Sequence, residues 1–166
     1  EILDPVGGQR DLQNKIVRST SSAVFMSDPL RLLRAFRFMA TFGFTIEPTT
    51  ERQIGKYCHL LYLVAEERIA YELDTIMASV DSIKTIKAMH ENGVLQELVP
   101  ELYQGVGVAQ PSSHHLDVFE HGIDALQHME NVQKEPEKYF PGYGQSLLEY
   151  LHGNRRKILL KWAALF

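Results

Sequence analysis

Apolar residues recur at helical spacing over most of residues 28–91, and this pattern carries the strongest prediction of local structure. Four helices are expected there: Asp28–Phe42, Pro48–His59, Glu66–Ser79 and Ser82–Glu91. Ser27 or Asp28 can cap the first of them, and Pro29 suits its first turn because an N–H there has no partner within the helix. Gly43 follows the last residue of that helix, where glycine commonly ends one.

The residues before this region show weaker patterns. Pro5 and paired glycines are typical of a turn. We expect, in order, a turn at Asp4–Gly8, a short helix within Gln9–Lys15, a brief strand at Ile16–Arg18 and a polar loop over residues 19–22.

The residues after position 91 alternate between helical and irregular stretches. A linker is expected over Leu102–Ser113, which is rich in glycine and glutamine, and a helix over Asp117–Met129. Asn131–Gly144 contains two prolines and two glycines and is predicted to be a long loop. A last helix is expected to begin near Leu147 or Asn154. Because strand patterns are scarce and no internal repeat is present, the predicted fold class is mainly α.

Composition limits the function classes. The chain has 166 residues, of which 45% are apolar, and its formal net charge of −4 means that any nucleic-acid site must be a local basic surface. A single cysteine excludes a disulfide framework, and no apolar run approaches the ~20 residues that span a bilayer, so we expect a cytoplasmic protein with no membrane partner. The chain starts without methionine and ends within an apolar helical pattern, which suggests part of a longer protein.

The first predicted helix carries the most informative polar residues. At ~100° per residue, Arg31, Arg34 and Arg37 fall on one arc of the helix roughly 120° wide, opposite most of its apolar residues. A solvated basic face is the plain alternative. A binding site is favoured because all three residues are arginine, which suits bidentate recognition of phosphates or base edges. Asp28 precedes Arg31 by three residues, within pairing distance on a helix.

The run Asp28–Phe38, followed by Gly43 and Phe44, resembles the neck-domain motif of class II tRNA nucleotidyltransferases (CCA-adding enzymes) and bacterial poly(A) polymerases. The resemblance implies that Asp28 and Arg31 pair with the incoming base and select C or A. It also implies that Arg34 and Arg37 support the nucleotide and its phosphates. Ser27 stands where the family often has glutamate, a departure expected to affect the rigidity of the neck more than base contact.

Two further segments carry the resemblance in the same order. Asp4–Gly8, with Asp11 and Ile16–Arg18, is similar to the end of the family's catalytic head domain. Glu67-Arg68-Ile69, followed by Glu72-Leu73, resembles the next neck motif, so Glu67 and Arg68 are expected to support the first motif. The resulting division is a remnant of the α/β head over residues 1–22, a helical neck and RNA-binding domain over 23–103, and the start of a helical HD-like domain over 104–166.

The resemblance also implies an activity for the parent protein. Such an enzyme adds C and/or A to the 3′ end of tRNA, or poly(A) to RNA, from CTP and ATP, with Mg²⁺ held by an Asp-x-Asp pair that this chain does not contain. The chain is therefore expected to supply base recognition and RNA binding, to contain no catalytic residue and to be inactive alone. Four aromatic residues are expected to form core around the arginine helix: Phe36, Phe38, Phe42 and Phe44.

The histidines near position 120 raise the question of a metal site. His114, His115, His121 and His128 surround one predicted helix, but they show no His-Glu-x-x-His spacing and have no cysteine partners. The segment 115–121 is similar to the opening helix of HD-type metal-dependent domains, in which the histidine matching His121 is one metal ligand. Because the adjacent His-Asp pair of such domains is not present, no bound metal is expected.

Two other functions remain open at this point. The chain could belong to an HD-type phosphohydrolase that uses the histidine segment, but such an enzyme has no need for the arginine stripe. It could also be a helical RNA-binding module without chemistry, for which a wider basic surface and stacking aromatic residues are expected. The sequence does not distinguish CCA, CC, A or poly(A) addition, and it does not give the oligomeric state.

Overall fold

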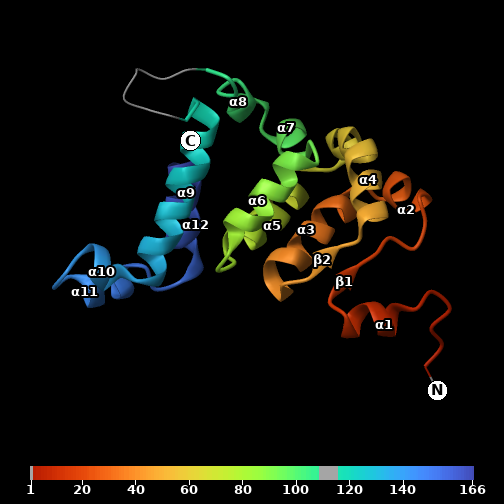
Figure 1. Ribbon diagram of the computed structural model, residues 1–166, viewed down its shortest axis with the longest axis horizontal. Helices are drawn as coiled ribbons and strands as arrows, with labels where there is room; N and C mark the ends of the chain where they lie inside the picture. Colours follow the sequence, from red (N-terminus) through yellow and green to blue (C-terminus); the bar gives the residue numbers. More distant parts are fainter. Residues whose placement is uncertain (1, 109–115) are drawn as a thin grey trace.

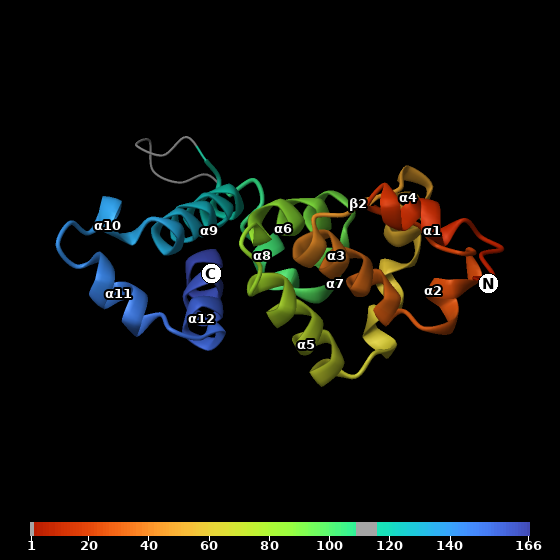
Figure 2. The same ribbon diagram turned by 90° about the horizontal axis from the view of Figure 1, so that it is seen from below.

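The computed structural model describes residues 2–108 and 116–166, which form an elongated helical protein. Helix α1 lies at one end and helices α10 and α11 lie at the other, in both views (Figures 1 and 2). The helices are α1 (Gly8–Gln13), α2 (Ala23–Ser27), α3 (Leu30–Phe42), α4 (Pro48–Tyr57), the 3-10 helix η1 (Cys58–Leu63), α5 (Glu66–Met77), α6 (Ser82–Glu91), α7 (Val94–Leu98), α8 (Pro100–Tyr103), α9 (Val118–Lys134), α10 (Pro136–Tyr139), α11 (Gly144–Tyr150) and α12 (Asn154–Leu165). The mainly α fold class is confirmed.

A short parallel sheet ties the N-terminal elements to the helices. Strand β1 (Ile16–Val17) pairs with β2 (Thr45–Ile46), with Ile16 opposite Thr45. The strand predicted at Ile16–Arg18 is therefore present, whereas β2 was not predicted. The pairing places the residues that follow β1 beside the start of α4.

Helix α3 lies at the centre of the core. Leu32, Leu33 and Phe36 are fully buried and face α5 and α6, while Arg31 and Arg34 are exposed on the opposite side. The predicted amphipathic helix is therefore confirmed, and Gly43 ends it with a left-handed backbone (φ 67°). The predicted cap is wrong: α3 begins after Pro29 without a side-chain cap, and Asp28 has an extended backbone.

Phe36 belongs to the core, as predicted, but Phe42 does not. Its side chain is 57% exposed, so the prediction of core packing is wrong for this residue. Six residues at 100° each place Phe42 about 120° around the helix from Phe36, away from the buried face. Phe38 and Phe44 are half-buried.

Several short elements differ from the predictions. Helices α2, α7 and α8 span four or five residues each, too few for periodicity to reveal them. The loop predicted over Asn131–Gly144 is wrong in part, because α9 continues to Lys134 and Pro136 begins α10, where proline suits the first turn. Helix α8 likewise occupies the start of the predicted linker, and residues 109–115 of that linker lie outside the described residues.

One buried cluster joins the central helices to the C-terminal pair. Phe119, Ile123 and Leu126 of α9 and Leu165 of α12 belong to the same hydrophobic cluster as the core of α3. The division into domains at residue 103 stays a prediction. Within the two described ranges, no helix combines the length and apolar character that crossing a membrane requires.

Helices α9 and α12 approach closely at Gly122. A Cβ built at Gly122 would lie 2.6 Å from the backbone oxygen of Leu165. We therefore expect Gly122→Ala to separate the two helices and to lower the free energy of unfolding by about 1–3 kcal/mol. Urea unfolding followed by circular dichroism measures this change.

Gly55→Ala is the matched control for that substitution. Gly55 is exposed within α4, and its added Cβ would make only an ordinary contact of 3.5 Å with the oxygen of Asn92. Alanine is the better helix former, so this variant is expected to be as stable as the wild type or slightly more stable. Equal stability of the two variants would contradict the close approach at Gly122.

Candidate functional site

Asp28 lies between two arginines from different helices. Its Oδ2 is 3.7 Å from Nε of Arg31 on α3, and its Oδ1 is 3.7 Å from Nη2 of Arg68 on α5. These distances indicate ion pairs rather than short hydrogen bonds. The structure thus brings together Asp28, Arg31 and Arg68; the supporting role of Arg68, expected from the family resemblance, stays a prediction. All three side chains remain partly exposed, so carboxylate and guanidinium groups are accessible to a ligand.

Arg37 has a different environment from the other arginines of α3. Its Nε is 3.3 Å from Oε2 of Glu72, and Nη1 donates a hydrogen bond of 3.4 Å to Oε1 of the same residue. Glu72 is buried, and burial raises the pKa of its carboxyl, while the nearby charges of Arg37 and Arg34 act in the opposite direction. The guanidinium of Arg37 is thus paired with a buried carboxylate. Its role toward a nucleotide stays a prediction.

The supporting acid differs from the one expected. Glu67 is exposed, and no hydrogen bond or ion pair joins it to the arginines in the described structure. Glu72 takes the bracing position instead, since it lies one turn beyond Arg68 and faces α3. In the sequence, Glu72 stands four residues before the apolar Ile76, on the face of α5 that is buried, and this spacing could have indicated it.

Arg31 and Arg34 line a hollow of about 320 Å³ beside the short sheet. Arg18 and Ser19, which follow β1, also line it, with Thr50 of α4 and Phe38 of α3. A space of this size, lined by several hydrogen-bond donors and by two aromatic rings, Phe25 and Phe38, suits a small polar ligand. The sequence did not predict that the residues after β1 would face the arginine helix, because the pairing of β1 with β2 brings them there.

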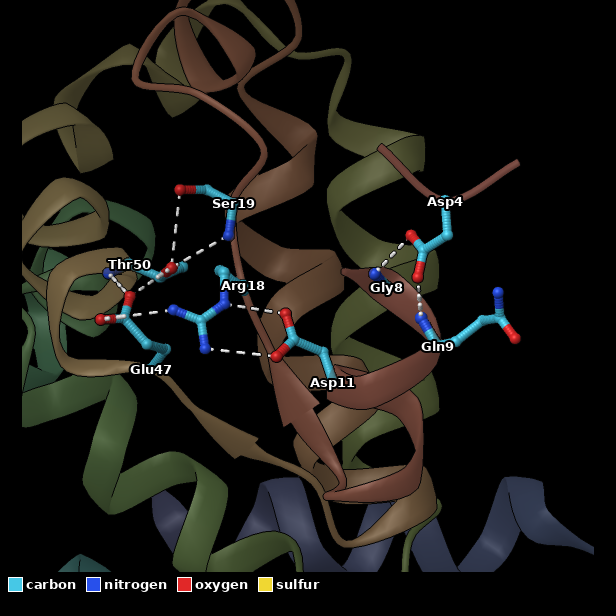
Figure 3. A network of polar contacts seen from close by, with 8 residues as sticks. All are labelled: Asp4, Gly8, Gln9, Asp11, Arg18, Ser19, Glu47 and Thr50. Carbon is cyan, nitrogen blue, oxygen red and sulfur yellow. Dashed lines mark hydrogen bonds and ion pairs between the residues drawn. The ribbon is translucent and has the colours of Figure 1, made fainter. Parts of the chain in front are cut away.

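A polar network fixes Arg18 at the edge of this hollow (Figure 3). Asp11 of α1 accepts two hydrogen bonds from Arg18, of 2.8 Å from Nε and 3.2 Å from Nη2. Glu47 Oε1 lies 3.9 Å from Nη1 of Arg18, and the other oxygen, Oε2, caps α4 by accepting from the backbone N–H of Thr50 at 2.9 Å. Backbone and hydroxyl donors of the first turn of α4 lower the pKa of Glu47 to about 2. Arg18 is thus oriented by carboxylates from two elements.

The histidine segment does not form a metal site in the part of the chain that the structure describes. His114 and His115 lie outside the described residues, and His121 is exposed on α9. His128 lies 3.4 Å from Asp124 on the same helix, and no group of three His, Cys, Asp or Glu side chains within residues 2–108 and 116–166 is arranged to hold a metal ion. Asp117 and Glu120 instead form a capping box at the start of α9.

Comparison with known proteins places the chain among tRNA nucleotidyltransferases. The family described as "Probable RNA and SrmB- binding site of polymerase A" matches residues 43–104. The A-adding tRNA nucleotidyltransferase of Deinococcus radiodurans is 39% identical in an alignment of 133 positions that covers 77% of this chain and 31% of that protein. The multifunctional CCA protein of Pseudomonas savastanoi pv. phaseolicola is 37% identical over 81% of this chain and 34% of its own length.

The fold also has solved relatives. A tRNA nucleotidyltransferase crystallised with a primer tRNA and an incoming ATP analogue superposes with a TM-score of 0.64 at 22% identity, over 98% of this chain and 46% of that one. The chain spans about a third of the length of the curated relatives it matches.

The helical fold and the matched RNA-binding segment define the class of the chain as a helical RNA-binding region. The chain belongs to the tRNA nucleotidyltransferase family and corresponds to its neck and RNA-binding region.

Proposed function

We propose that this chain recognises the incoming nucleotide and binds RNA in an enzyme that adds C and/or A to the 3′ end of tRNA. The observation that carries the proposal is the position of Asp28 between Arg31 and Arg68, next to the hollow lined by Arg31 and Arg34. The similarity to A-adding and CCA-adding proteins supports CTP and ATP as the nucleotides and tRNA as the partner.

The chemistry of the pair favours these two bases. A carboxylate only accepts hydrogen bonds and a guanidinium only donates them. Cytosine and adenine each present an amino donor beside a ring-nitrogen acceptor on their pairing edge, which matches Asp28 and Arg31 respectively. Uracil and guanine present a carbonyl acceptor beside an N–H donor, the reverse order. An Asp–Arg pair held in one orientation therefore selects C and A without a nucleic-acid template.

The other residues of the site position this pair. Arg68 engages the second oxygen of Asp28 and limits rotation of the carboxylate. Arg34 adds positive charge for phosphate groups at the same hollow. Glu72 and Arg37 hold α5 against α3, which keeps Arg68 within reach of Asp28.

The metal chemistry of such an enzyme has to come from residues other than these. Phosphoryl transfer needs Mg²⁺ to neutralise developing charge, and the described residues gather no ligand set that fits a metal ion. Two finer proposals rest on the sequence: an HD-like domain over residues 104–166, from the family resemblance, and a cytoplasmic location, from the single cysteine. Whether the product is CCA, a single A or a poly(A) tail is left to the assay.

Arg31→Ala tests base recognition in the full-length protein. A tRNA transcript lacking its 3′ CCA is incubated with Mg²⁺ and each nucleoside triphosphate in turn, and products are resolved at single-nucleotide resolution. Loss of one contact to the base should reduce discrimination against UTP and GTP by about 1–3 kcal/mol, or roughly 5- to 150-fold. Selective addition by the wild type supports the proposal.

Arg155→Ala is the control, because Arg155 is exposed on α12 and has no part in this hollow. It should keep the wild-type selectivity. Unchanged UTP and GTP incorporation by Arg31→Ala would show that the Asp28–Arg31 pair is structural. No extension of any tRNA by the wild type would contradict the proposed function itself.

A further inference from the structure

Three aromatic side chains adjoin one another where α3 ends, and we name Phe38, Phe42 and Phe44 the aromatic end of α3. The ring centroids of Phe38 and Phe42 are 6.0 Å apart, and those of Phe42 and Phe44 are also 6.0 Å apart. Phe42 is 57% exposed, although a phenylalanine gains about 1.5–3 kcal/mol from full burial. Single exposed apolar residues are common in proteins, but three adjoining rings form a continuous apolar surface.

The aromatic end continues the surface that carries the arginines. Phe38 lines the hollow of about 320 Å³ together with Arg31 and Arg34. It also lines a second hollow of about 460 Å³, together with Phe44. Both hollows share Val17, Arg18 and Ser19 as well, so they lie side by side along one surface. A ligand that occupies the first hollow can therefore extend over Phe38 and Phe44, and the exposed ring of Phe42 adjoins both of these rings.

Positive charge borders these rings. The guanidinium carbon of Arg37 lies 5.1 Å from the centroid of the Phe38 ring, within the range of a cation–π contact. Arg18 lies between the two hollows. A surface with rings in the middle and guanidinium groups at its edge complements a ligand that is flat and aromatic in one part and anionic in another. An unpaired RNA nucleotide has this chemistry, whereas an apolar protein segment has no use for the arginines.

We propose that an unpaired base of the RNA strand stacks on the aromatic end of α3 while the neighbouring arginines contact its phosphates. This inference rests on the proposed function and adds to it a place for the RNA strand, separate from the Asp28–Arg31 pair that selects the incoming nucleotide. Stacking does not distinguish the bases, because each of them has a π-face. The site therefore holds the end of the RNA whichever base was added last.

The test uses the 166-residue chain and a short single-stranded RNA with 2-aminopurine as its 3′-terminal base, whose fluorescence is quenched on stacking. Binding by the wild type should quench the fluorescence. Phe42→Leu should weaken affinity by about 5- to 150-fold and remove most of the quenching, since stacking contributes ~1–3 kcal/mol per base. Phe42→Trp should restore both. Because Phe42 is mostly exposed, neither substitution is expected to unfold the chain, which circular dichroism checks.

Two further variants separate the inference from the proposed function. Phe140→Leu changes another exposed phenylalanine (48%), between α10 and α11, and should leave affinity and quenching unchanged. Arg34→Ala should weaken affinity through lost phosphate contact. Binding that depends on Arg34 but is unaffected by Phe42→Leu would overturn the stacking site alone. Absence of RNA binding by the wild-type chain would overturn both the proposed function and this inference.

Discussion

Lys161→Ala should lower the free energy of unfolding by about 3–5 kcal/mol, because it removes one partner of a buried ion pair. Lys161 Nζ lies 2.9 Å from Oε1 of Glu130 and donates a hydrogen bond of 2.7 Å to the backbone oxygen of Ser79. The two charged side chains are 4% and 0% exposed. Without the lysine, the Glu130 carboxylate stays buried with no opposite charge. Urea unfolding at neutral pH measures the loss.

Lys134→Ala is the matched control for this prediction. Lys134, the last residue of α9, pairs with Asp81, with 2.6 Å between Nζ and Oδ1. The two side chains are 37% and 71% exposed. An exposed pair contributes only about 0–1 kcal/mol, so this variant should be nearly as stable as the wild type. Similar losses for the two variants would mean that burial does not determine the strength of the Lys161–Glu130 pair.

The same carboxylate connects three parts of the chain. Glu130 Oε1 accepts hydrogen bonds from the backbone N–H and the hydroxyl of Ser82, at the start of α6, as well as from Lys161 of α12. Helix α6 therefore receives its cap from a residue 48 positions further along the chain. This buried network fixes α9 and α12 against the helices that carry the candidate site.

The sequence predicted contacts between residues close together in the chain, but not contacts between residues on different helices. Asp28 and Arg31 are three residues apart, so helical geometry alone predicted that they would meet, although the helix begins later than expected. The pairs Arg68–Asp28 and Arg37–Glu72 depend on how α5 packs against α3, which periodicity does not specify. Resemblance to a family indicated Arg68, but it placed the supporting acid at Glu67 rather than Glu72.

The burial of the charged residues Lys161 and Glu130 could not be predicted from the sequence either. Lys161 stands in an apolar helical pattern where a solvated lysine would be the ordinary interpretation, and its partner Glu130 lies 31 residues away. The aromatic end of α3 shows the reverse case: Phe42 was predicted to be buried because it is apolar, but its angular position on α3 directs it away from the core. The long helices could be predicted from the spacing of apolar residues, whereas the tertiary contacts that shape the site could not.

Arg37→Ala should lower the free energy of unfolding by about 2–4 kcal/mol near neutral pH. Glu72 is buried, and its Oε2 accepts no hydrogen bond among the described residues, so the charge of Arg37 is its main compensation. The expected loss is somewhat smaller than for Lys161→Ala because the Arg37 side chain is 21% exposed. Helix α5 would then hold Arg68 less firmly against Asp28, and the same variant should weaken nucleotide selectivity.

The dependence of this loss on pH identifies its cause. Burial already raises the pKa of Glu72 above its ordinary value of 4.5, and removing Arg37 should raise it further. A carboxyl whose pKa is higher in the folded than in the unfolded state favours folding below the unfolded pKa and loses that contribution as pH rises through the folded pKa. The deficit of Arg37→Ala should therefore be small near about pH 4.5 and grow towards neutral pH. Adding Glu72→Gln removes the buried charge, so the double variant should recover part of the stability and lose this pH dependence. A deficit that stays constant with pH would instead assign the effect of Arg37 to the contact of its guanidinium with the ring of Phe38.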